Sequence, residues 1–148
     1  MRTFLKNWGP VLLWMGFIFW MSTDSFSGEN TSRIIKPLIQ FLLPGAASAT
    51  VDMIHTAIRK CGHVTEYFIL GLLLFHAFRL NSREKERVWH WAILSLIAGM
   101  LYAAGDEFHQ SFTVMRGASP IDVGIDTAGG MLAQVASVVW YFFKKKTF

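Results

Sequence analysis

The chain has 148 residues, of which 53% are hydrophobic and only 16% are charged. About a quarter of the residues are charged in an ordinary soluble domain, so this composition excludes such a domain. Six Trp and 13 Phe fit the aromatic belts of a bilayer protein. The formal net charge of +4 would suit a nucleic-acid-binding protein, but the positions of the charges, given below, exclude that class. The single cysteine, Cys61, has no partner for an internal disulfide.

Four apolar stretches are each close to the length that a membrane crossing needs. A bilayer core about 30 Å thick takes about 20 apolar residues in a helix. The sequence therefore predicts an all-α, polytopic membrane protein, built as one domain over residues 1–148. We expect a bundle of four transmembrane helices, with the spans at about residues 5–25, 62–78, 88–105 and 121–143.

The first stretch has a second interpretation. Arg2 and Lys6 precede its apolar run, and Ser25-Phe26-Ser27 has the small-x-small form of a signal-peptide cleavage site. We interpret the stretch as a retained membrane helix.

The segment between the first two spans is predicted to carry an extra helix. Thr31 or Ser32 is a suitable cap for its start, and Pro44-Gly45 indicates its end. About twelve amphipathic residues are too few to span a bilayer easily, so this helix is expected to lie in the interface or to re-enter the membrane. Residues 51–59 are expected to form a helix that leads into the second span.

The charge distribution predicts the orientation. The N-terminus, the connection between the second and third spans, and the C-terminus together hold nine basic residues and two acidic ones, Glu84 and Glu86. The remaining charges are five basic and eight acidic residues. Because cytoplasmic segments of membrane proteins are enriched in Lys and Arg, both termini are predicted to be cytoplasmic. The basic residues are then topological anchors and not a nucleic-acid-binding patch.

Ionisable residues at the start of the second span form the first part of a candidate site. Arg59, His63 and Glu66 share a helix face at i, i+4 and i+7, and Lys60 follows Arg59. Glu66 lies about five residues inside the expected boundary, which is roughly 7 Å of helix. An unpaired charge at membrane depth costs several kcal/mol. We therefore expect Glu66 to pair with Arg59, His63 or Lys60.

The end of the third span supplies a second group of polar side chains. Tyr102, Asp106 and His109 share a face at i, i+4 and i+7, and Glu107 and Gln110 lie on the adjoining side. Both this group and the preceding one are predicted at the outer ends of their helices.

The start of the fourth span adds two carboxylates, Asp122 and Asp126, one turn apart. Arg116, in the preceding connection, is expected to reach one of them. Gly129 and Ala133 form a small-xxx-small pair, which allows a neighbouring helix to approach closely.

Three interpretations of this charged cluster stay open. The first is purely structural, a set of ion pairs that joins the helices, although desolvation offsets much of the stability of buried pairs. The second is a site for an anionic headgroup or phosphate, held by Arg59, Lys60 and Arg116, with a carboxylate–His pair for acid–base chemistry.

The third interpretation is a divalent metal site, since carboxylate and His side chains on facing helices form metal centres in some bundles. His63 with Glu66, and Asp106 with His109, are i, i+3 pairs. Asp122 and Asp126 would add oxygen ligands. The adjacent cations oppose metal binding, so no cofactor is predicted and a metal ion is kept as the alternative.

Several of these motifs resemble the VanZ-like family, in the right order over nearly the whole chain. They are Arg59-Lys60-x-x-His63-x-x-Glu66-Tyr67, Leu101-Tyr102-Ala103-x-x-Asp106-Glu107-x-His109-Gln110, and Arg116-Gly117 before Asp122-x-x-x-Asp126-x-x-Gly129. Ser22 and Asp24-Ser25, after the first span, are similar to the family's beginning. The family takes its name from a protein linked to resistance to teicoplanin, a lipid-bearing glycopeptide antibiotic. Its members are bacterial membrane proteins, which implies a multi-pass protein of the cytoplasmic membrane.

The resemblance and the charged cluster together give two main functional hypotheses. In the first, the protein binds a membrane lipid or a lipid-linked cell-wall precursor at the outer leaflet and is linked to glycopeptide resistance. In the second, it is a hydrolase or transferase acting on an anionic envelope lipid. Glu66 or Asp106 would then be the base, His109 the acid–base partner, Arg59 and Arg116 the anion clamps, and Tyr67 and Tyr102 the residues that orient the headgroup. A transporter is a weaker third class, because no span carries a polar path at its middle.

Overall fold

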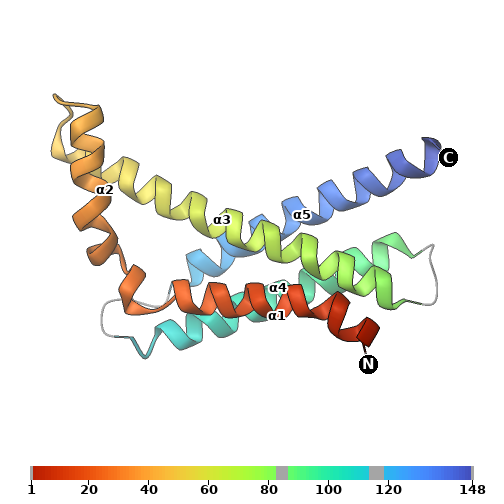
Figure 1. The fold of residues 1–148 in the computed structure, drawn as a ribbon. Helices are drawn as coiled ribbons and strands as arrows, with labels where there is room; N and C mark the ends of the chain where they lie inside the picture. Colours follow the sequence, from red (N-terminus) through yellow and green to blue (C-terminus); the bar gives the residue numbers. More distant parts are fainter. Residues whose placement is uncertain (1, 83–86, 114–118, 148) are drawn as a thin grey trace.

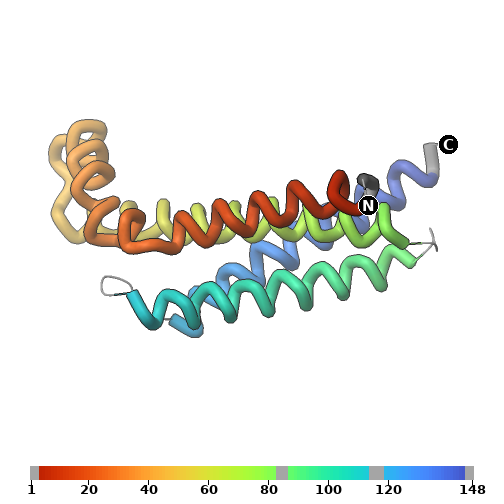
Figure 2. Tube along the Cα trace, turned by 60° about the horizontal axis from the view of Figure 1, so that its bottom comes forward, coloured from red at the N-terminus to blue at the C-terminus, as the bar shows by residue number. Residues whose placement is uncertain are grey.

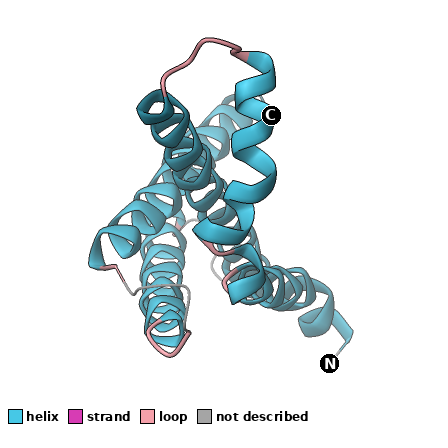
Figure 3. Ribbon diagram, turned by 90° about the vertical axis from the view of Figure 1, so that its left-hand side faces the viewer, coloured by secondary structure: helices cyan, strands magenta, loops and turns pink. Residues whose placement is uncertain are grey.

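The computed structural model describes residues 2–82, 87–113 and 119–147 (Figure 1). Over these ranges the chain forms five α-helices and one short 3-10 helix, joined by turns, and contains no β-strand (Figure 3). The predicted all-α class is therefore confirmed.

Helix α1 (Arg2–Met21) ends four residues earlier than predicted. The first span was expected to reach residue 25. Ser22 N–H still donates to the carbonyl of Ile18, four residues back, but Thr23 N–H donates to the carbonyl of Trp20, only three residues back. The Thr23 hydroxyl donates to the same carbonyl at 2.8 Å. Such local side-chain bonds compete with continued helix. The 3-10 helix η1 (Asp24–Phe26) follows.

Helix α2 (Gly28–Leu42) is the extra helix that was expected after the first span, but the predicted cap was wrong. Ser27 is the N-cap, and its hydroxyl accepts a hydrogen bond from Asn30 N–H at 3.3 Å. Thr31 and Ser32 lie inside the first turns, where their hydroxyls donate to backbone carbonyls of the preceding turn. The helix ends close to the predicted position.

The amphipathic character of α2 is visible in its packing. The helix packs against α3 and buries Ile39. Its other apolar residues are largely exposed, among them Ile34, Leu38 and Phe41. In Figure 1 it stands across one end of the bundle of long helices.

Helix α3 (Ser48–Asn81) is a single 34-residue helix, so residues 51–59 lead into the second span without a break, as predicted. At 1.5 Å per residue this helix is about 51 Å long, which exceeds the roughly 30 Å of a bilayer core. Helix α4 (Val88–Gln110) and helix α5 (Pro120–Thr147) contain the third and fourth predicted spans.

Three helices are long and apolar enough to cross a membrane by length and composition, namely α3, α4 and α5. Within the described ranges α1 is not one of them. The multi-pass character is thus supported by three candidate spans, whereas the prediction named four.

The four long helices run side by side, and α5 packs most closely against α3 (Figure 2). A Cβ atom built on Gly129 of α5 would lie only 2.5 Å from the backbone oxygen of Val64 on α3. One built on Gly71 of α3 would lie 2.7 Å from Cβ of Ala133 on α5. The predicted close approach at the small-xxx-small pair is therefore confirmed.

The chain directions decide where the polar segments meet. Helix α1 begins, α3 ends, α4 begins and α5 ends at one end of the bundle (Figure 1). The opposite end holds α2, the start of α3, the end of α4 and the start of α5. An apolar core fills the space between α1, α3 and α4, with Val11, Ile18, Tyr67, Leu70 and Ala103 among its buried residues.

Candidate functional site

The polar side chains of α3, α4 and α5 meet at the end of the bundle that carries α2. His63 Nδ1 of α3 lies 3.1 Å from Oδ1 of Asp126 on α5. Asp126 is only 1% exposed. Gly129 lies one turn after Asp126, so the close approach of α5 to Val64 of α3 places the carboxylate beside the imidazole.

A second cross-link between the same helices lies about one turn further toward the end. Lys60 Nζ of α3 lies 3.3 Å from Oδ1 of Asp122 on α5, and both side chains are partly exposed. Lys60 and His63 are therefore each paired with an aspartate of α5. The sequence interpretation had offered both residues as partners of Glu66.

A buried hydrogen-bonded group joins the end of α1 to α4. The Ser22 hydroxyl donates to Asp106 Oδ2 at 2.5 Å. The Gln110 side-chain amide donates to the same oxygen at 3.0 Å and to Ser22 Oγ at 3.3 Å. All three residues are at most 5% exposed. Ser22 was not predicted as a site residue. Its signals in the sequence are that a polar residue follows the apolar run of α1 and that this position is similar to the beginning of the VanZ-like family.

Two of the predicted ligand-binding residues instead hold helices together. Glu107 accepts a 2.7 Å hydrogen bond from the backbone N–H of Ser119, the residue before the first residue of α5. Tyr102 donates its hydroxyl proton to the carbonyl of Met15 on α1 at 2.6 Å.

Two other predicted residues are packed against neighbouring side chains and do not line the cavity described next. Tyr67 is 1% exposed and lies in the apolar core, with its ring 6.3 Å from that of Tyr102. The His109 ring packs on Phe19 of α1 with the ring centres 4.4 Å apart.

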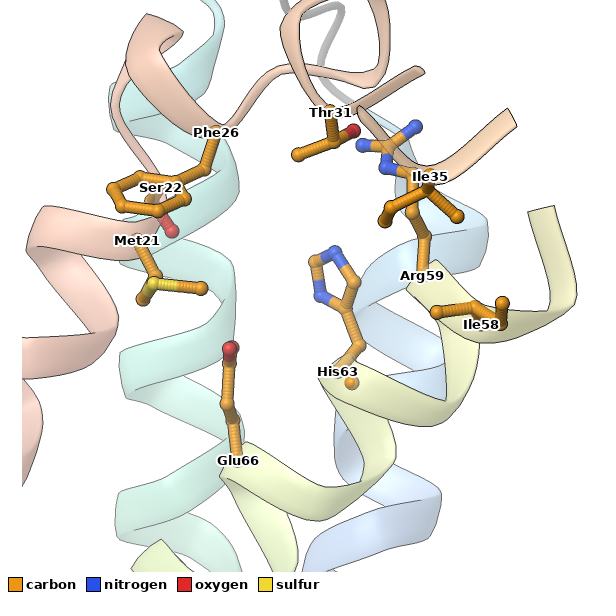
Figure 4. A pocket seen from close by; sticks show the side chains of 10 residues that line it. Met21, Ser22, Phe26, Thr31, Ile35, Ile58, Arg59, His63 and Glu66 are labelled. Atoms are coloured by element: carbon orange, nitrogen blue, oxygen red, sulfur yellow. The ribbon is translucent and has the colours of Figure 1, made fainter. Parts of the chain in front are cut away.

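A cavity of about 180 Å³ lies between the end of α1, η1, α2 and the first half of α3 (Figure 4). Figure 4 shows the Glu66 carboxylate and the His63 ring entering it from α3, and Ser22 facing it from the end of α1. Its ten lining residues combine apolar and polar side chains: Met21, Ser22, Phe26, Thr31, Ile35, Ile58, Arg59, Gly62, His63 and Glu66.

The Arg59 guanidinium lies at the α2 side of this cavity. A Cβ built on Gly28, the first residue of α2, would be 2.6 Å from Arg59 Nη1. Within the part of the chain that the structure describes, Arg59 forms no ion pair. The absence of a side chain at Gly28 thus makes room for a cation beside the cavity.

The structure therefore divides the predicted site residues into groups. Arg59, His63 and Glu66 share the cavity, as their common helix face predicts. Asp126 does not line the cavity but contacts His63, and Asp106 and Gln110 do not line it but form hydrogen bonds with Ser22. Arg116 lies outside the described residues. No group of three or more His, Cys, Asp or Glu in the described ranges is arranged to hold a metal ion, so the metal interpretation finds no ligand set there.

The described helices, three of them long and apolar enough to cross a membrane, define a multi-pass membrane protein with a cavity of mixed polar and apolar lining at one end of its bundle. The VanZ/LLP1 family model matches residues 8–143, and the chain belongs to the VanZ/LLP1 family. The resemblance seen in the sequence motifs is confirmed. No curated protein and no solved structure matches the chain.

Proposed function

We propose that this protein binds the headgroup of an anionic lipid, or of a lipid-linked envelope component, in the cavity between α1, α2 and α3. The observation that carries the proposal is the mixed lining of that cavity. Arg59 and His63 supply hydrogen-bond donors suited to an anion. Phe26, Ile35 and Ile58 supply apolar surface. Such a lining suits a molecule with a charged headgroup and an apolar tail.

The charges favour an anion that also carries hydrogen-bond donors. An arginine fork matches the oxygens of a phosphate group. Lys60 is engaged with Asp122, whereas Arg59 is the cation that lines the cavity. Glu66 faces the same space, and a carboxylate accepts hydrogen bonds. A phosphate near Arg59 with hydroxyl or amine groups near Glu66, as in a phosphorylated sugar headgroup, would be compatible with the charges of both side chains.

The same proposal includes four membrane crossings in a bacterial cytoplasmic membrane. Helix α1 buries Val11 and Ile18 in the core that α3 and α4 form, and it runs alongside them. If α3, α4 and α5 cross the bilayer, α1 must cross it as well. By the positive-inside rule both termini are then cytoplasmic, the cavity faces outward, and α2 lies in the interface with Ile34, Leu38 and Phe41 toward the lipid.

A protein that holds a lipid-linked component at the outer leaflet would alter how the lipid tail of a teicoplanin-type glycopeptide inserts. The link to resistance is therefore part of this proposal. It predicts that variants with an impaired cavity lose any resistance the protein confers while the protein is still produced.

The direct test is lipid binding by the purified protein. Native mass spectrometry measures the affinity of the protein for phosphatidylglycerol, for a polyprenyl pyrophosphate and for the zwitterionic phosphatidylcholine. The measurement is made on the original chain and on Arg59→Gln. Loss of a charge-assisted contact of about 1.5–3 kcal/mol would weaken binding of the anionic lipids roughly 10- to 100-fold. Arg33→Gln is the matched control, since Arg33 lies on the exposed side of α2 and pairs only at the surface with Glu29.

Two results would contradict the proposal. If Arg59→Gln binds the anionic lipids as tightly as the original chain does, the cavity is not the binding site. If the original chain binds phosphatidylcholine as tightly as it binds the anionic lipids, it has no preference for a negatively charged headgroup. Either result would favour the structural interpretation, in which the charged cluster only joins helices.

A further inference from the structure

Ser22 combines three properties that are not combined elsewhere among the cavity residues. It lines the cavity, its hydroxyl already donates to a buried carboxylate, and a third side chain fixes that carboxylate. The Ser22 Oγ to Asp106 Oδ2 distance is 2.5 Å, at the short end of the range for a hydroxyl bonded to an anionic oxygen. Gln110 donates to both atoms and so holds their relative orientation.

This arrangement is the one that activates a hydroxyl nucleophile: a nucleophile, a base within hydrogen-bond reach, and a group that orients the base. Asp106 is the base and Gln110 is the orienting group. Because the Ser22 proton points to Asp106, a lone pair of Oγ is free of that bond and can face the cavity.

Across the same cavity, the His63 ring is also held by a buried carboxylate, that of Asp126. Its Nδ1 is engaged with Asp126, which leaves Nε2 as the ring nitrogen for a molecule in the cavity. A buried carboxylate behind an imidazole fixes the ring and stabilises its protonated form. Arg59 adds a fixed positive charge for the phosphoryl oxygens.

We propose that Ser22 is the nucleophile of a phosphoryl-transfer reaction on the terminal phosphate of a lipid, with Asp106 as its base, His63 as the general acid and Arg59 as the anion clamp. This proposal rests on the proposed function, because the substrate headgroup must first occupy the cavity. It replaces His109 by His63 as the acid–base residue, since His63 lines the cavity and His109 packs on Phe19.

The first step transfers the phosphoryl group to the protein. Ser22 Oγ forms a bond to phosphorus, and its proton passes to Asp106. The bond between phosphorus and the leaving oxygen breaks, and protonated His63 gives its proton to that oxygen.

In the second step a water molecule attacks the phosphoserine. One water proton returns to His63 and the hydroxyl becomes part of inorganic phosphate. The bond between phosphorus and Oγ breaks, and Asp106 returns its proton to Ser22. The net reaction is hydrolysis of a lipid phosphate ester or anhydride by one water molecule.

An alkyl fluorophosphonate tests this proposal without knowledge of the natural substrate. An activated serine attacks its phosphorus, the phosphorus–fluorine bond breaks and fluoride leaves. The folded, detergent-solubilised protein should gain the mass of one probe less that of HF, and peptide mass spectrometry should place the adduct on Ser22. Ser25→Ala is the matched control, because Ser25 is exposed in the same connection, and it should be labelled like the original chain.

Two variants separate this proposal from the proposed function. Ser22→Ala should lose the label but keep its binding of polyprenyl pyrophosphate. Asp106→Asn, assayed where its thermal unfolding shows a folded protein, should be labelled about 100-fold more slowly, the size typical of a lost general base. Absence of label on Ser22 in a chain that still binds the lipid would overturn the nucleophile and leave the binding proposal standing.

Discussion

The imidazole of His63 on α3 lies 3.1 Å from the carboxylate of Asp126 on α5, one turn away from the point where Gly129 of α5 meets Val64 of α3. The backbone approach and the polar pair depend on each other. With any residue other than glycine at 129, a Cβ atom would meet the backbone of Val64 and push apart the two helices that carry the pair. Without the pair, a carboxylate that is 1% exposed would lose its one hydrogen-bond partner among the described residues.

Removing the imidazole should therefore be much more harmful than removing an exposed partner. His63→Ala is expected to lower the free energy of unfolding by about 3–5 kcal/mol, since it leaves the Asp126 carboxylate buried and uncompensated. Lys60→Ala, one turn away, breaks a partly exposed ion pair. This variant should lower the free energy of unfolding by no more than about 1 kcal/mol. Thermal unfolding in one detergent measures both. Equal shifts for the two variants would contradict the structure of the pair.

The close approach of α3 and α5 makes a second stability prediction. At Gly129 a Cβ would lie 2.5 Å from a backbone oxygen, which has no rotamer by which to give way. Gly129→Ala should therefore destabilise the protein by about 1–3 kcal/mol, as overpacking does.

Gly124→Ala is the matched control on the same helix, since nothing lies within 4 Å of its Cβ position. There the gain in helix propensity, about 1 kcal/mol, should dominate and raise the unfolding temperature. A stabilising Gly129→Ala change would show that the two helices can move apart.

Helix positions were largely predictable because they depend on local pattern. Apolar runs predicted α3, α4 and α5, and helical spacing placed Arg59, His63 and Glu66 on one face. The N-cap of α2 was missed because several candidate hydroxyls lie close together in this segment, and only the backbone geometry selects Ser27.

Contacts between helices were not predictable in the same way. Ser22 and Asp106 are 84 residues apart in the chain, and hydrophobic periodicity does not specify the register of one helix against another. His109 shares a face with Asp106 on α4, yet only the position of Phe19 on α1 shows which neighbour covers it. Pairing across helices therefore required the tertiary structure.

The space beside Gly28 gives a prediction about binding that does not remove any charge. A methyl group at Gly28 would lie 2.6 Å from Arg59 Nη1, so the guanidinium must shift, and its flexible side chain allows that shift. Gly28→Ala should keep its unfolding temperature but bind polyprenyl pyrophosphate several-fold more weakly. Gly45→Ala, which meets nothing within 4 Å, should bind it like the original chain. Unchanged affinity in Gly28→Ala would show that the guanidinium position is unimportant for binding.

The topology can be tested with the single native cysteine removed. In a Cys61→Ser background, a membrane-impermeant maleimide applied to intact spheroplasts should label Ser25→Cys in η1, the segment that joins α1 to α2. Lys6→Cys lies in the first turns of α1 and Lys145→Cys near the end of α5. These two helix ends lie at the other end of the bundle (Figure 1), so both residues should be labelled only after the membrane is opened. Lys6 discriminates best, because the proposed function has α1 cross the bilayer beside the helices against which it buries Val11 and Ile18, whereas only α3, α4 and α5 qualify as spans by length and composition in the described ranges. Labelling of Lys6→Cys in intact spheroplasts would show that α1 does not cross, and labelling confined to Lys6→Cys and Lys145→Cys would place the cavity on the cytoplasmic side.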